Sequence, residues 1–104
     1  MNDQNMSKME EFRVELEEIR RNEGELCVAI IGRDGEYWKD AMTAAESCAD
    51  VILPLPEDLK IHEYKRILIR YHCHCLMYSK EFGELAYHVE NDGVTWVQSL
   101  MHIG

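Results

Sequence analysis

The sequence predicts a single small α+β domain, spanning residues 1–104, in which an antiparallel sheet packs against one long helix. Apolar residues repeat at helical spacing in two stretches, 9–19 and 61–82. Two Asp-Gly turns, at 34–35 and 92–93, each follow a strand-like segment and stand at the same offset before a Trp. The chain has 104 residues, 46% of them hydrophobic, which suits one domain with its own core. We expect only residues 1–6 to be flexible.

The first expected element is a helix over residues 8–22. Ser7 and Glu10 have the spacing of a capping box, in which each side chain satisfies a free amide of the first turn. Gly24 is placed to end the helix in a left-handed conformation. The apolar stripe consists of Met9, Phe12, Leu16 and Ile19.

A hairpin over residues 25–39 and a helix over residues 40–50 are expected next. Residues 25–31 form an apolar strand, and the Asp-Gly pair at 34–35 is a strong hairpin signal. Asp40 is a suitable N-cap for the alanine-rich helix. An alternative starts this helix at Gly35, runs it to Asp50 and pairs it with a strand over residues 51–55, which gives a strand–helix–strand unit.

The longest expected element is a helix over residues 57–81. Seven apolar residues follow one another at alternating spacings of three and four: Ile61, Tyr64, Leu68, Tyr71, Cys75, Tyr78 and Phe82. A second apolar stripe on the same helix consists of Ile69, Cys73, Leu76 and Met77. A helix that is apolar on two sides is sandwiched in its domain or meets a partner. These four residues are therefore a candidate dimer or partner face.

A second hairpin is expected over residues 84–100, turning at Asn91-Asp92-Gly93. Both Asp-Gly turns belong to the pattern D-G-x-x-W, which ends at Trp38 and at Trp96. The shared pattern favours two hairpins of the same design, and it is the main argument for a hairpin at 25–39.

The charge of the chain is strongly acidic and unevenly placed. The formal net charge is −9, and residues 1–63 contain 16 acidic and 7 basic side chains. Such a surface repels nucleic acid and anionic membranes and attracts basic protein surfaces. No apolar run approaches the roughly 20 residues of a membrane helix, and no secretory signal is visible. With four cysteines and no signal for export, we expect a reducing, cytoplasmic setting.

Catalysis and cofactor binding are not expected. The chain lacks a phosphate-binding glycine motif, and the G-x-S-x-G and H-E-x-x-H patterns are absent. The run His72, Cys73, His74 and Cys75 offers zinc ligands, but consecutive residues cannot all converge on one ion, because helical neighbours point about 100° apart. A zinc-stabilised module would need a further ligand from Cys27, Cys48, His62 or His88.

The leading functional hypothesis is a non-enzymatic acidic protein that binds and inhibits a basic, nucleic-acid-handling protein. In composition the chain resembles small acidic inhibitors such as phage-encoded anti-restriction and anti-CRISPR proteins, which implies nucleic-acid mimicry by surface carboxylates. The candidate partner-binding residues are Glu11, Glu15, Glu18, Asp34, Glu36, Asp40, Glu57 and Asp58.

The alternative hypothesis is an acidic secretion or assembly chaperone that works as a homodimer. The segment Val51-Ile52-Leu53-Pro54-Leu55-Pro56 before the long helix, together with the Asn91-Asp92-Gly93 turn, resembles type III secretion chaperones. The third helix of that family, after the last strand, has no counterpart here. Dimerisation through residues 69–77 would favour this alternative.

Overall fold

The computed structural model describes residues 7–32, 37–91 and 97–103. In these residues, helices and strands alternate along the chain. The elements are α1 (Lys8–Glu23), β1 (Cys27–Ile31), α2 (Trp38–Cys48), β2 (Val51–Leu55), α3 (Ile61–Arg70), β3 (Cys75–Tyr78), the 3-10 helix η2 (Lys80–Phe82), α4 (Gly83–Asn91) and β4 (Ser99–His102).

All four strands are parallel, in the order β2-β1-β3-β4. The antiparallel sheet predicted from the sequence is therefore wrong, and the fold class is α/β. Strand β1 explains why: all five of its residues are buried, so both faces of the strand are covered. Parallel sheets are covered by helices on both faces, and their strands are continuous apolar runs without alternation.

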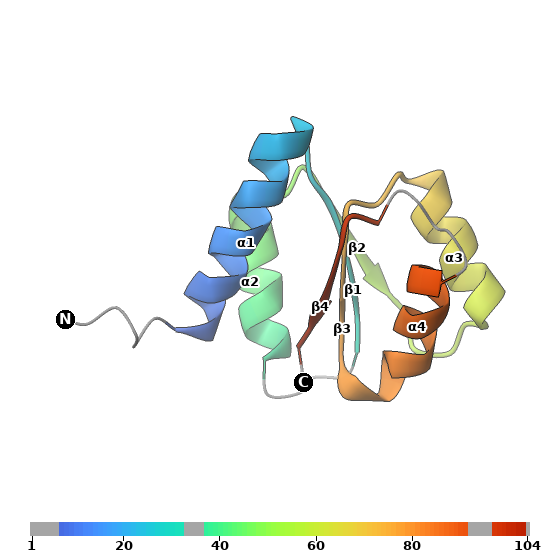
Figure 1. The fold of residues 1–104 in the computed structure, drawn as a ribbon. Helices are drawn as coiled ribbons and strands as arrows, with labels where there is room; N and C mark the ends of the chain where they lie inside the picture. Colours follow the sequence, from blue (N-terminus) through green and yellow to red (C-terminus); the bar gives the residue numbers. More distant parts are fainter. Residues whose placement is uncertain (1–6, 33–36, 92–96, 104) are drawn as a thin grey trace.

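The helices form two layers, one on each face of the sheet (Figure 1). Alternate strand residues supply the two cores. Val28 and Ile30 pack toward α1 and α2, whereas Ala29 and Ile31 pack toward α3 and α4. The chain runs from β1 outward to β2 and then returns to the other side of β1 for β3, which makes the sheet doubly wound.

Helix α1 forms where it was predicted. The Ser7 hydroxyl accepts a hydrogen bond from the Glu10 amide at 3.2 Å, and Gly24 ends the helix at φ 84°. The Gly24 amide donates to the Arg20 carbonyl at 2.8 Å. Only half of the capping box is present, because the Glu10 carboxylate pairs with Arg13.

The predicted hairpin over residues 25–39 does not form. The chain passes from β1 into α2, so Trp38 and Lys39 are helical where a returning strand was expected. The strand–helix–strand alternative has the correct order of elements, with β2 parallel to β1. The helix predicted at 40–50 is confirmed as α2, although its N-cap is Tyr37 and Asp40 lies inside the first turn.

The long helix predicted over residues 57–81 is also wrong. Helix α3 ends at Arg70, and His72 takes a left-handed conformation at φ 51°. The Cys73 amide donates to the Leu68 carbonyl at 3.0 Å, and the chain then enters β3. Strand β3 pairs with both β1 and β4. The apolar residues at 75–78 suit a short buried strand as well as a helix, so this pairing, and not the helical spacing, decides their structure.

The second predicted hairpin, over residues 84–100, is a helix followed by a strand. Helix α4 covers Gly83–Asn91, and β4 joins the edge of the sheet beside β3. The Asp-Gly pairs at 34–35 and 92–93 lie outside the described residues, as does Trp96. Among the described residues, no helix has both the length and the apolar character needed to cross a membrane.

Candidate functional site

In this doubly wound sheet, one candidate site is the carboxyl edge between β1 and β3. In folds of this kind, ligands bind where the strand order reverses. Gly32 follows β1 there, and Ser79 follows β3. The Ser79 side chain is buried, and its hydroxyl has no hydrogen-bond partner among the described residues. Among the described residues, this edge therefore holds a buried polar group without a partner.

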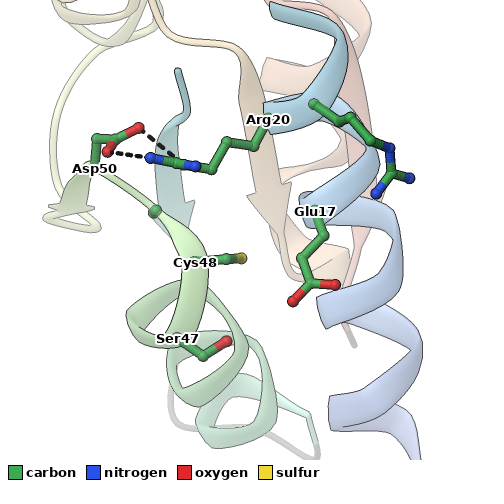
Figure 2. Close-up of a pocket in the computed structure, with 7 residues that line it drawn as sticks. Glu17, Arg20, Ser47, Cys48 and Asp50 are labelled. Carbon is green, nitrogen blue, oxygen red and sulfur yellow. Dashed lines mark hydrogen bonds and ion pairs between the residues drawn. The ribbon is translucent and has the colours of Figure 1, made fainter. Parts of the chain in front are cut away.

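A hollow formed by described residues lies at the opposite end of the sheet, between the last turns of α1 and α2 (Figure 2). It has a volume of about 610 Å³. Its lining residues are Glu17, Arg20, Arg21, Ser47, Cys48, Ala49 and Asp50. The main polar feature is an ion pair in which the Arg20 guanidinium reaches from α1 to Asp50, just after α2.

Asp50 joins three parts of the chain. Arg20 Nε and Nη2 donate to its two carboxylate oxygens at 3.2 and 2.9 Å, as the dashed lines of Figure 2 mark. The Leu26 amide donates to Asp50 Oδ2 at 2.9 Å. The hydrogen bond from Arg20, together with that from the Leu26 amide, lowers the pKa of Asp50. This carboxylate therefore fixes the ends of α1 and α2 to the start of β1.

The other groups of this hollow are poorly suited to catalysis. The Ser47 hydroxyl donates to the Ala44 carbonyl at 2.7 Å, and Glu17 pairs with Arg13 at 3.1 Å. Burial raises the pKa of the Cys48 thiol, which disfavours the nucleophilic thiolate. The geometry thus describes a structural clamp rather than a reactive centre.

Of the Cys/His run at 72–75, residues 73–75 are buried, whereas His72 is exposed. The Cys27 amide donates to His74 Nδ1 at 2.9 Å, which places the ring proton on Nε2. The pKa of Cys73 is raised mainly by its hydrogen bond with Cys27 and to a lesser extent by burial. Burial raises the pKa of Cys75. Protonated, buried thiols are poor nucleophiles. Among the described residues, no three His, Cys, Asp or Glu side chains converge as a metal site would require.

The predicted acidic residues come from separate elements. Glu11, Glu15 and Glu18 are exposed on α1, Asp40 is half-buried in α2, Glu57 and Asp58 are exposed between β2 and α3, and Asp34 and Glu36 lie outside the described residues. Of these, Glu15 and Glu18 line one hollow of about 340 Å³.

That hollow also includes residues that the sequence reasoning missed. Its other lining residues are Ile19, Asn22 and Glu23 from α1, together with Gln98 and Ser99 at the start of β4. Glu23 could have been included from its place near the end of α1. Gln98 and Ser99 could not, because their position follows from the parallel pairing of β4 with β3.

The four residues of the predicted apolar face do not share a surface. Ile69 is 44% exposed near the end of α3. Cys73, Leu76 and Met77 are fully buried, and the last two lie on opposite faces of β3. The stripe depended on a helix that the structure replaces with a strand.

Comparison with known proteins reveals similarity in fold. No protein-family model matches the chain, and neither does any curated protein. The anthranilate CoA ligase AuaEII, solved in complex with anthranoyl-AMP, matches 93% of this chain with a TM-score of 0.73 and 17% identity. A protein described as a long-chain-fatty-acid CoA ligase, from Rhodopseudomonas palustris CGA009, matches 92% with a TM-score of 0.71 and 15% identity. The chain spans only 19% and 25% of these two proteins. It therefore has an α/β fold that also occurs as one part of CoA ligases.

Proposed function

We propose that this chain provides the α/β module of an adenylate-forming, CoA-ligase-type protein and supports the reaction without carrying it out alone. The observation that carries this proposal is the fold similarity over 93% of the chain to a ligase of which it spans 19%. The chain would then be a folded structural part of a larger catalytic assembly, and a further polypeptide segment would complete that assembly.

The chemistry of the described residues favours a structural role over a catalytic one. Adenylation joins a carboxylate to the α-phosphorus of ATP and releases pyrophosphate, so it needs cationic groups and amides directed at the phosphates. In the hollow between α1 and α2, Arg20 is already engaged by Asp50. The carboxyl edge, where Ser79 has an unpartnered hydroxyl, is the side that we expect to face bound substrate.

The proposal is tested by acid-dependent exchange of radiolabelled pyrophosphate into ATP, with anthranilate and palmitate as the acids. We expect the purified chain to show no exchange. We expect exchange when the endogenous protein is captured from the cells that make it, together with the polypeptide that completes it. A mock capture provides the background. Exchange by the purified chain alone, or captured protein without exchange above background, would overturn the proposal.

A second candidate is an acidic, non-enzymatic protein that binds and inhibits a basic partner. The specific observation in its favour is that Glu15, Glu18 and Glu23 line one hollow and form no ion pair within the described residues. Titration of a nucleic-acid-handling enzyme with the chain tests this candidate. Salt-sensitive inhibition would support it, and unchanged activity at saturating chain would exclude that enzyme as the partner.

A further inference from the structure

Strand β4 has an edge that no other described strand pairs with. Strand β4 is the last in the order β2-β1-β3-β4, and it pairs only with β3 among the described strands. In Figure 1 it lies at the near edge of the sheet. Unpaired strand edges present amides and carbonyls that can pair with another chain.

The hydrogen bonds of β4 identify which backbone groups face outward. The Ser99 amide donates to the His74 carbonyl at 3.2 Å, and the Ile103 amide donates to the Tyr78 carbonyl at 2.8 Å. Backbone groups alternate in direction along a strand. The amides of Leu100 and His102 therefore point away from β3. The opposite edge strand, β2, contains Pro54, which has no amide to donate, whereas Ser99–His102 contains no proline.

Carboxylates lie beside this edge. Glu15, Glu18 and Glu23 of α1 share a hollow with Gln98 and Ser99, at the start of β4. None of the three forms an ion pair within the described residues. Glu15 and Glu23 are about 12 Å apart along the helix axis, at roughly 1.5 Å per residue. Three alternate side chains of an extended strand span about 13 Å.

We propose that the β4 edge accepts an extended basic segment of a partner polypeptide as an added strand, with lysine or arginine side chains over these glutamates. The proposal rests on the proposed function, in which other polypeptide completes the module. Backbone pairing with Leu100 and His102 holds the segment, and charge complementarity selects a basic one. A neutral or acidic strand would leave the three carboxylates unpaired or repelled.

A synthetic eight-residue peptide that alternates lysine and valine provides the probe, and isothermal titration at low salt measures its binding. We expect Glu15→Gln, Glu18→Gln and Glu23→Gln combined to weaken binding by about 3- to 100-fold, because exposed ion pairs contribute modestly. The matched control is the combination of Glu46→Gln, Glu81→Gln and Glu84→Gln, which removes the same charge from exposed positions elsewhere. The control should bind within about twofold of the unaltered protein.

Strand addition is tested separately from charge. His102→Pro removes an outward amide that β3 does not use, and His102→Val retains it. We expect the Pro variant to lose about 2- to 13-fold in affinity, the change expected for losing one hydrogen bond, while the Val variant keeps its affinity. Thermal unfolding of both variants confirms that each is folded. A peptide with methylated valine nitrogens and one with methylated lysine nitrogens should differ, since only one set faces β4.

The outcomes separate the two proposals. Equal binding by the Pro and Val variants would overturn strand addition. Equal effects of the two charge-removal combinations, or no binding of the basic peptide at low salt, would overturn the β4 edge as its site. None of these results depends on pyrophosphate exchange, so the proposed function stands or fails on its own experiment.

Discussion

Substituting Gly32 with Ala probes the contact between the carboxyl ends of β1 and β3. A Cβ at this position would lie 2.3 Å from the Ser79 hydroxyl oxygen and 2.8 Å from Ser79 Cβ. Gly32 also has φ 154°, which side chains rarely adopt. The backbone strain costs about 1–3 kcal/mol, and the overpacking costs a further 1–3 kcal/mol or so. We therefore expect Gly32→Ala to lower the free energy of unfolding by about 2–6 kcal/mol.

A double-mutant cycle with Ser79→Gly separates these two contributions. Removing the Ser79 side chain eliminates both close contacts but leaves the strain at φ 154°. We expect Gly32→Ala to cost about 1–3 kcal/mol less in the Ser79→Gly background than in the original protein. Urea unfolding followed by circular dichroism measures all four proteins. An additive cycle, or a Gly32→Ala effect below about 0.5 kcal/mol, would refute the close approach of these strand ends.

Three further predictions concern stability and thiol reactivity. His74→Ala leaves the buried Cys27 amide without its acceptor and should cost about 1–3 kcal/mol of unfolding free energy in urea; a neutral effect would contradict this hydrogen bond. The hydrogen bonds from Arg20 and from the Leu26 amide lower the pKa of Asp50. The stabilisation that Asp50 gives the fold is therefore complete above its unfolded pKa of about 3.9 and is lost as the pH falls through its lower folded pKa. The urea midpoint of the original protein should therefore exceed that of Asp50→Asn at pH 7 and approach it in acid; a constant gap would refute the linkage. In a thiol-reagent assay at pH 8, half-buried Cys48 should react first and buried Cys75 only after unfolding, and early labelling of Cys75 would contradict its burial.

Elements whose signals are local in the sequence form where they are predicted. Ser7, the apolar stripe of α1 and Gly24 act within one helix, so their spacing predicts its bounds without reference to the rest of the chain. The alanine-rich helix α2 was predicted for the same reason, and its Ala41 and Ala45 are buried.

The errors arose where short apolar runs could fit either kind of structure. Residues 75–78 continue the helical spacing of α3, yet they form a strand buried on both faces. Periodicity cannot distinguish a short buried strand from buried helix. The stronger signals were the continuous apolar runs at 26–31 and 51–55, which are typical of parallel strands on either side of a helix.

The candidate surface was only partly predictable for a related reason. Glu15 and Glu18 were selected from the charge of α1, but charge alone does not show what lies beside them. Their position next to Gln98 and Ser99 results from β4 pairing in parallel with β3, which is a contact distant in sequence.

The parallel α/β fold and the β4 edge both depend on the direction of strand pairing, so measuring that direction is the most direct test. Nuclear Overhauser contacts in the labelled protein measure this direction across β1, β3 and β4. We predict amide-to-Hα contacts consistent with the parallel register Ile30–Met77–Met101. Strong Hα–Hα contacts between these strands, as antiparallel pairs produce, would contradict the fold and the proposals built on it.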